Sequence, residues 1–548
     1  MAIQATARGQ LSLETDVLVI GGGPAGTWAA ISAAAKGAKV ILVDKGYCGS
    51  SGATAPSGTG VWYIDPEREK REEAKASRYA MGGQLAEHEW MNRVLDRTYE
   101  NMNKLGNLGY PFPVDPSGKP HKRGLQGPEY MKLMRKLVQK SGVKILDHSP
   151  VLELLADDYG VGGAAGVNTQ TGDAWSIRAG AVVIATGGCA FLSRALGCNV
   201  LTGDGYLFAA EAGADLSGME FSNAYAICPT FSSVTKTAYY SYASFYYEDG
   251  TVVEGAGSKR GRSVIARNLL AGRQVYAKLD QAPEDLKPLL RVAQTNFFLP
   301  FDRRGIDPFR DLFPVTLRLE GTVRGTGGIR IVDETCATKV PGLYAAGDAA
   351  TRELICGGFT GGGSHNSAWA MSSGSFAGEG AAEYVLKLGD SAKSRSLRGL
   401  SSQSLTSASA DGGASQSRTQ EYVQAVQDEV KPYDRNLFRT EQGLSDSIGR
   451  LDGLWKAQRE NAVSVSAEGV KAREAAAMTA TARWMYHSAL ARKETRGMHK
   501  REDFPTIDGG QRHRLISGGL DEVWVSTERV ADDAASQERQ PVKESVTA

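Results

Sequence analysis

The pattern of apolar and polar positions near the start of the chain predicts a strand, a tight turn, a helix and a second strand. Residues 16–20 form a short β-branched run, residues 21–26 are rich in glycine, and residues 27–36 have the composition of a helix. A second apolar strand over residues 39–43 ends at Asp44. This order of elements is typical of a dinucleotide-binding βαβ unit.

Further along, the pattern predicts helices, then a β-meander, then more buried strands. Residues 66–108 are helical and charged, and residues 151–177 alternate like the strands of a meander. Residues 160–166 imitate a second nucleotide loop, but no helix of sufficient length follows them, so we predict no NAD(P)H domain. Residues 181–188 and 341–348 each deliver a glycine turn at the end of an apolar strand.

The last third of the chain changes character twice. Residues 391–418 contain ten serines in 28 positions and almost no large apolar side chains, which predicts a flexible linker. Amphipathic helical patterns resume over residues 420–501, and residues 536–548 have the composition of a polar tail.

Composition narrows the class of protein. The chain has 548 residues, enough for two or more packed units, and its 63 basic and 62 acidic residues leave a net charge of +1. This balance excludes nucleic-acid or membrane binding by bulk charge. The six cysteines form no CxxC pair, which argues against a disulfide framework, a zinc ribbon, or an iron-sulfur cluster on this chain. With no export signal and no apolar run long enough to span a membrane, we expect reduced thiols, no metal site and a cytoplasmic location.

The glycines of the first turn have separate physical tasks. Gly21 permits the sharp turn, Gly23 lets the backbone approach a pyrophosphate, and Gly26 allows the helix to pack closely on the strand. The amino end of the helix then faces the phosphates. Asp44 lies where a carboxylate accepts hydrogen bonds from the hydroxyls of an adenosine ribose, so this unit predicts a bound nucleotide.

Five blocks in a fixed order resemble the fumarate reductase and succinate dehydrogenase flavoprotein family, which includes aspartate oxidase and the α subunit of adenylylsulfate reductase. The last of these is the most similar branch. The likeness covers about residues 14–505. The blocks are the Gly21 loop with Asp44, residues 185–188, residues 202–221, residues 342–348 and residues 491–505.

The resemblance implies an α/β fold: a doubly wound, Rossmann-type FAD-binding domain interrupted by an α+β capping domain, with a helical C-terminal domain. We expect the following boundaries: FAD-binding domain, residues 14–230 and 326–388; capping and substrate domain, 231–325; flexible linker, 389–419; helical domain, 420–530; polar tail, 531–548.

The resemblance also implies which residues surround FAD. One group holds its ADP half, a second lines the flavin, a third flanks the adenosine, and Asn366 and Ser367 lie beside the flavin at the amino end of a helix. Since no histidine occurs in the loop where covalent members attach the flavin, we expect noncovalent FAD. The predicted FAD contacts are Gly21, Gly23, Pro24, Ala25, Gly26, Asp44, Lys45, Ser51, Gly52, Thr54, Ala55, Ser57, Ala185, Thr186, Gly187, Asp204, Gly347, Asp348, Asn366 and Ser367.

The residues that grip C4 dicarboxylates in this family are largely missing. Cys228 and Val323 stand where the family has histidines, and residues 360–363 replace a motif with an arginine. Losing three charge-assisted contacts, each worth about 1.5 to 3 kcal/mol, would leave succinate or fumarate weakly bound. A substrate of another kind is therefore predicted. Six aromatic residues between positions 239 and 247 either wall its site or pack within the capping domain.

One catalytic block keeps its family residue. Residues 260–267 align with the helix that carries the proton donor and place Arg262 at the donor position, although Ser263 replaces an aspartate. Arg262 is our candidate catalytic residue, and a surface ion pair is the alternative.

These observations together predict an FAD-dependent oxidoreductase. We expect it to transfer a hydride or electron pair between FAD and a small organic or sulfur-containing substrate. We expect its electron partner to be a ferredoxin-like iron-sulfur protein or subunit, because the chain has neither a cluster motif nor an NAD(P)H loop. The alternatives are a flavin oxidase that uses O2 and a non-catalytic electron-transfer subunit.

Overall fold

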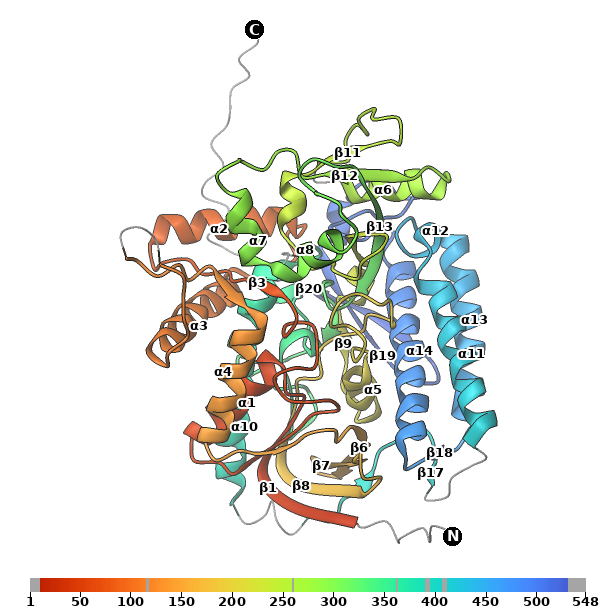
Figure 1. Cartoon of the computed structure of the whole chain (residues 1–548). Helices are drawn as coiled ribbons and strands as arrows, with labels where there is room; N and C mark the ends of the chain where they lie inside the picture. Colours follow the sequence, from red (N-terminus) through yellow and green to blue (C-terminus); the bar gives the residue numbers. More distant parts are fainter. Residues whose placement is uncertain are drawn as a thin grey trace, which may run out of the picture.

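The largest sheet of the protein has a parallel centre. The structure is a computed structural model and describes residues 10–114, 118–258, 261–360, 363–389, 395–406 and 412–530. The parallel strands are β1 (Gln10–Ile20), β2 (Val40–Val43), β5 (Lys144–Leu146), β8 (Ala174–Ile184) and β15 (Leu343–Ala345). Helices α1 (Pro24–Ala35) and α10 (Gly363–Leu388) pack on each other and on this sheet (Figure 1). The predicted α/β class is confirmed.

The chain leaves the parallel centre through a β-meander, as its alternating pattern predicts. Strands β6 (Val151–Asp157) and β7 (Gly160–Val167) are antiparallel, and β7 pairs with the first half of β8. A side chain at Gly163 would place its Cβ 2.2 Å from the carbonyl oxygen of Ile177. These glycines therefore serve close strand packing, which explains why a glycine-rich run here is no nucleotide loop.

Helices and a short hairpin fill the space before the meander. The helices are α2 (Arg68–Met81), α3 (His88–Asn107) and α4 (Gly127–Lys140), and strand β3 (Gly58–Gly60) pairs with β4 (Gly124–Gln126). In α3 the buried residues Met91, Val94, Leu95, Met102 and Leu105 recur every three or four positions, and this face packs against α10.

A second, antiparallel sheet forms the capping domain above the first. Its order is β10 (Ala224–Pro229), β13 (Phe313–Gly321), β12 (Val275–Lys278) and β11 (Ser244–Tyr246). Its helices are α6 (Gly261–Leu270), α7 (Lys287–Ala293) and α8 (Thr295–Asp302). Because β10 pairs with β13, this sheet begins at Ala224, seven residues before the boundary that the sequence predicts.

The C-terminal part is helical until it turns back to the FAD-binding part. The helices are α11 (Gly412–Val430), α12 (Tyr433–Asn436), α13 (Glu441–Arg459) and α14 (Ala467–Ala491). The chain then forms a hairpin of β19 (His513–Gly518) and β20 (Trp524–Arg529), where the sequence predicts only helix. β19 pairs with β9 (Leu216–Ser217), which pairs with β14 (Gly328–Ile329), so the edge of β9 supplies hydrogen bonds that no local pattern shows.

The serine-rich segment is more structured than its composition predicts. Strand β16 (Arg398–Gly399) pairs with β6, and β17 (Leu405–Thr406) pairs with β18 (Val463–Ser464). The Arg395 guanidinium pairs with the Asp157 carboxylate and donates to the carbonyl of Val161 at 3.0 Å. Long-range pairing thus fixes residues that have too few apolar side chains to order themselves. Parts of the predicted linker and the whole predicted tail lie outside the described residues.

Within the part of the chain that the structure describes, no helix has both the length and the apolar composition that spanning a bilayer requires.

Candidate functional site

The loop between β1 and α1 has the geometry that its glycines predict. Gly21 adopts a φ of 108°, in the left-handed region that favours glycine. A Cβ at Gly26 would lie 1.8 Å from the carbonyl oxygen of Gly21, whereas a Cβ at Gly23 would meet no atom within 4 Å. Gly26 thus serves packing, and Gly23 borders open space.

The carboxylate of Asp44 fixes the turns that follow each of the first two strands. One of its oxygens accepts from the amide of Gly22 at 2.6 Å. The other accepts from the amide of Gly46 and from the hydroxyl of Ser51, both at 2.7 Å. Asp44 therefore positions the loop itself, and its predicted contact with a ribose stays a prediction.

A cavity of about 900 Å³ begins at the glycine loop and continues under the capping domain. It brings together residues from four separate segments of the chain. Three predicted residues do not line it: Gly26, Ala55 and Arg262. The predicted residues that line it are Gly21, Gly23, Pro24, Ala25, Asp44, Lys45, Ser51, Gly52, Thr54, Ser57, Ala185, Thr186, Gly187, Asp204, Gly347, Asp348, Asn366 and Ser367.

Lys45 joins two distant carboxylates at the wall of this cavity. Its ammonium lies 2.6 Å from Asp204, at the start of α5 (Asp204–Glu211), and 3.0 Å from Glu474 in α14. It also donates to the hydroxyl of Thr202 at 2.9 Å. Burial opposes the charge of Lys45, but the two carboxylates outweigh burial and raise its pKa. The sequence gives no sign that α14 takes part.

Asp348 is held by a buried arginine. It lies in the short turn Gly347–Ala349 and pairs with Arg352, which also donates to the carbonyl of Thr322 at 2.8 Å. Burial raises the pKa of Asp348, and Arg352 opposes this rise. Arg352 is 1% exposed, so it orders this wall of the cavity from behind.

The amino end of α10 is tied to the capping domain. The Asn366 side-chain amide donates to the carbonyl of Val323 at 3.0 Å. The amide oxygen of Asn366 is buried and has no hydrogen-bond partner among the described residues. Since Asn366 lines the cavity, this free acceptor is suited to a ligand that donates a hydrogen bond.

At the far end of the cavity the capping domain supplies two cations that no sequence motif singles out. Lys236 and Arg324 both line the cavity and pair with Glu320, at 2.9 and 3.4 Å. Burial opposes ionisation of Glu320, but Lys236 and Arg324 lower its pKa to about 2. Arg324 directly follows Val323, so only its place beside a motif position could have indicated it.

Arg262 lies next to this group without lining the cavity. It is the second residue of α6, and its side chain is exposed. It interacts electrostatically with Arg324 and Glu320, and it makes no hydrogen bond or ion pair with any described residue. Its alternative as a surface ion pair is therefore not supported, and its catalytic role stays a prediction.

The positions that carry dicarboxylate-binding histidines in the family are apolar or turned inward here. Val323 lines the cavity and is 2% exposed. Cys228 is buried, and its thiol donates to the carbonyl of Ser232 at 2.8 Å. Two of the three glycines that replace the arginine motif lie outside the described residues. Of the six aromatics, only Tyr239 lines the cavity, so most of that run packs within the capping domain.

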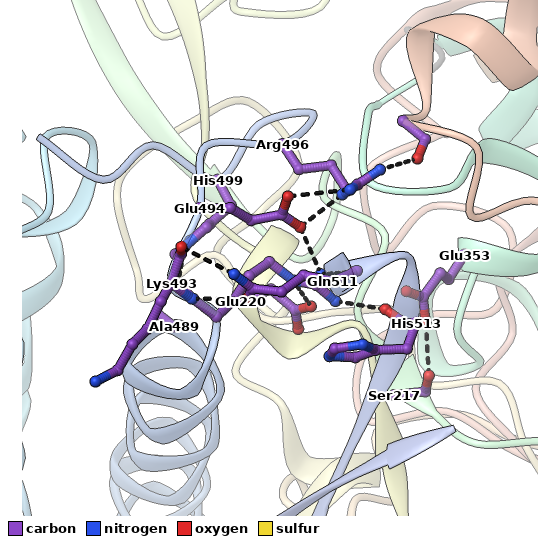
Figure 2. A network of polar contacts seen from close by, with 12 residues as sticks. Ser217, Glu220, Glu353, Ala489, Lys493, Glu494, Arg496, His499, Gln511 and His513 are labelled. Atoms are coloured by element: carbon purple, nitrogen blue, oxygen red, sulfur yellow. Dashed lines mark hydrogen bonds and ion pairs between the residues drawn. The ribbon is translucent and has the colours of Figure 1, made fainter. Parts of the chain in front are cut away.

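A buried network of charged side chains stands behind the site, where the chain leaves α14 (Figure 2). Arg492 donates to Glu220 at 2.8 Å and to Glu494 at 2.9 Å. Glu494 also accepts from Arg496 at 2.6 Å. These four side chains are almost fully buried, so each charge depends on its partners.

Two carboxyl groups in this network lack full compensation. Glu353 accepts from the hydroxyl of Ser217 at 2.7 Å, while its other oxygen and one oxygen of Glu220 have no partner among the described residues. Burial and the nearby Glu220 raise the pKa of Glu353 to about 7. Glu353 begins the short helix α9 (Glu353–Cys356), directly after Arg352, so the network supports the turn that holds Asp348.

Comparisons with known proteins agree with this architecture. The profile of the FAD binding domain matches residues 16–232, and the profile of the fumarate reductase flavoprotein C-terminus matches residues 427–546. A fumarate reductase (CoM/CoB) subunit of Methanothermobacter marburgensis is 25% identical over 539 residues, which are 90% of this chain and 95% of that protein. The fumarate reductase flavoprotein subunit of Escherichia coli is 25% identical over 90% of this chain and 89% of its own length.

Solved structures show the same fold. Escherichia coli quinol fumarate reductase superimposes with a TM-score of 0.79 at 21% identity, over 96% of this chain and 98% of the other. Adenylylsulfate reductase of Archaeoglobus fulgidus superimposes with a TM-score of 0.74 at 19% identity, over 96% and 97% of the two chains.

Proposed function

Because the chain belongs to the fumarate reductase and succinate dehydrogenase flavoprotein family and is an FAD-dependent oxidoreductase, we propose that it oxidises or reduces a small organic or sulfur-containing anion under its capping domain. One observation carries the proposal. A single cavity runs from the glycine loop to the cations Lys236 and Arg324.

The residues along the first part of the cavity suit FAD. The open space at Gly23 and the amino end of α1 favour a pyrophosphate, and the free amide oxygen of Asn366 suits a hydrogen-bond donor on the flavin. Bound FAD supplies the capacity to accept or donate an electron pair. The loop after β2 has no histidine, which supports noncovalent attachment. Acid precipitation of the purified protein should then leave the yellow colour in the supernatant.

The far end of the cavity favours a negatively charged group on the substrate. Arg324 is the better candidate for direct contact, because its ion pair with Glu320 is long at 3.4 Å. Lys236 already bonds to Glu320 and to the carbonyl of Leu196 at 2.9 Å, so it adds charge more than a free donor. Gln294 and Tyr239 also line this end and would surround the rest of the substrate.

The same end disfavours C4 dicarboxylates. A dicarboxylate needs cationic or donor groups at both of its ends, whereas Val323 presents an apolar side chain and the Cys228 thiol is engaged by Ser232. We therefore infer a substrate with one anionic group.

An iron-sulfur partner is also part of the proposal. The names of two relatives, from Methanothermobacter marburgensis and Escherichia coli, describe them as subunits, so those proteins work within larger assemblies. All six cysteines of this chain are buried and free, which supports a reducing compartment such as the cytoplasm. We propose that a ferredoxin-like protein or subunit exchanges electrons with the flavin.

The test is anaerobic flavin reduction or oxidation, followed in the visible flavin band, with a panel of small carboxylates and sulfur anions. Arg324→Met should raise the half-saturating concentration of the active anion by about 10 to 100-fold. The matched control is Arg303→Met, which removes an exposed arginine just after α8 and should leave this concentration unchanged. Turnover with succinate or fumarate at ordinary millimolar concentration would contradict the proposal. Peroxide formation without any partner would instead identify an oxidase.

A further inference from the structure

A second cavity lies where the three parts of the molecule meet. It has a volume of about 730 Å³ and shares no lining residue with the flavin cavity. The FAD-binding part contributes the loop after β8, the capping domain contributes β13, and the helical part contributes α11 and α12 (Figure 1). The hydroxyl of Tyr433 in α12 donates to the carbonyl of Leu317 in β13 at 3.0 Å, which fixes one wall.

Three cations line this cavity, one from each part of the molecule: Arg194, Arg318 and Lys431. None of the described residues that line it is acidic. The amides of Gln424 and Gln427 add polar groups to the wall. Such a lining is suited to an anion and to little else.

The hydrogen bonds of these cations are largely unused. Neither Arg194 nor Lys431 makes a hydrogen bond or ion pair through its side chain with any described residue. Arg318 donates to the carbonyls of Ser193 at 3.5 Å and Ser232 at 3.2 Å, and its buried Nε has no partner there. Most donors of the three side chains thus remain available to a ligand.

The charge of this cluster is poorly compensated. Asp428 interacts with Lys431 but does not line the cavity, and the carboxyl end of α11 adds only a partial negative charge. Burial lowers the pKa of Lys431, and the like charges of Arg194 and Arg318 lower it further. A bound anion would relieve this repulsion and so bind favourably.

The loop that supplies Arg194 is held in an uncommon conformation. Phe191, Leu192 and Arg194 have φ values of 54°, 49° and 63°, in the left-handed region that is unfavourable for these residue types. Gln427 stabilises the loop by donating to the carbonyl of Phe191 at 2.8 Å. The strained loop keeps Arg194 at the cavity, opposite the two other cations.

The geometry points to a binding site for a small multivalent oxyanion, of the phosphate or pyrophosphate class, that bridges the FAD-binding, capping and helical parts. A single negative charge would leave two cations uncompensated, whereas a phosphate or pyrophosphate group matches three. By contacting all three parts, the bound oxyanion stabilises their arrangement around the flavin cavity. This inference does not depend on the identity of the redox substrate.

The experiment is isothermal titration of the FAD-loaded protein with pyrophosphate, and separately with inorganic phosphate, at low ionic strength. FAD must be bound so that the glycine loop is filled and does not itself take up the probe. We expect saturable binding of pyrophosphate, accompanied by a rise in the melting temperature, and weaker binding of phosphate. Lys431→Met should weaken pyrophosphate binding by about 10 to 100-fold.

The matched control is Lys456→Met, which removes an exposed lysine of α13 that makes no hydrogen bond with any described residue. It should bind pyrophosphate like the unmodified protein. Arg194→Met provides a second test from a separate part of the fold, and it should weaken binding as Lys431→Met does. Absence of saturable binding, equal weakening by Lys456→Met, or loss of binding only in Arg324→Met would overturn the proposal, since the last result would assign the anion to the substrate cavity.

Discussion

Lys45 is a single side chain on which two buried carboxylates depend. It is 18% exposed and lies between Asp204 and Glu474, which are 16% and 5% exposed. Its removal leaves both carboxylates without their main partner in a site where water cannot replace it. Losing one partner of a buried ion pair costs far more than the pair itself contributes.

We therefore expect Lys45→Met to lower the free energy of unfolding by about 3 to 5 kcal/mol, as measured by urea denaturation of the FAD-loaded protein. Lys471→Met is the matched control, because Lys471 pairs with the same Glu474 at 2.8 Å but is 66% exposed. Its loss should cost about 0 to 1 kcal/mol. Equal losses in the two variants would contradict the bridging role of Lys45.

Arg262 offers a test of the catalytic prediction at the same scale. If Arg262 donates a proton or stabilises developing negative charge, Arg262→Ala should retain FAD but slow the chemical step by about 10² to 10⁴-fold. Arg262→Lys should recover only part of this rate, because lysine keeps the charge without the planar fork. Stopped-flow flavin spectroscopy with the active anion is the measurement. An unchanged rate in Arg262→Ala would leave Arg324 as the cation of this site.

At the scale of elements, the turn from β1 to α1 divides its work between two glycines. Gly26→Ala should destabilise the FAD-free protein by about 1 to 3 kcal/mol or more, because the new Cβ overlaps the Gly21 carbonyl. Gly23→Ala should change that stability by less than about 0.5 kcal/mol, yet weaken FAD binding about tenfold or more by occupying the open space. Urea denaturation of the FAD-free protein and FAD fluorescence titration separate the two effects. If both variants fold and bind FAD alike, the division of roles is wrong.

Local patterns predicted the elements that depend on local sequence. The βαβ unit, the meander and the long helices follow from periodicity, glycine turns and apolar runs over ten to twenty residues. The hairpin of β19 and β20 did not, because its pairing partner β9 lies about 300 residues earlier and leaves no local signal. The same holds for the strands in the serine-rich segment, which Asp157 and β6 fix from a distance.

The site divides in the same way. Residues of contiguous motifs, such as Gly23 and Asp44, were predictable because their spacing is their function. Lys236 and Arg324 were not, since their contribution arises when β13 brings Glu320 between them. Ala55 was expected to line the flavin by its place in a loop, but that loop turns its side chain away from the cavity.

At the scale of the whole molecule, the buried network behind α14 couples stability to pH. Burial and Glu220 raise the pKa of Glu353 from 4.5 to about 7, so the folded protein holds a proton that the unfolded chain has released. The stabilisation is complete below about pH 4.5 and is lost as the pH rises to about 7. The free energy of unfolding should therefore fall over this range, by at most about 1.4 kcal/mol per pH unit for one proton.

Urea denaturation at several pH values between 5 and 8 measures this dependence. Glu353→Gln should flatten it, because the amide stays neutral at every pH. Glu254→Gln changes an exposed glutamate with no hydrogen bond to any described residue and should keep the slope of the unmodified protein. If Glu353→Gln keeps that slope as well, the proton is held elsewhere.

The ion pair between Lys45 and Glu474 also constrains how the protein is made. The two residues are 429 positions apart, so on a ribosome that adds 5 to 20 residues per second Lys45 waits roughly 20 to 90 s for its second carboxylate. During that time the nascent FAD-binding part lacks both β15 and α14, and its central sheet has an open apolar edge at β8. Loading of the cofactor thus belongs to the end of biosynthesis, and an enzyme of this shape depends on chaperones for the interval before it.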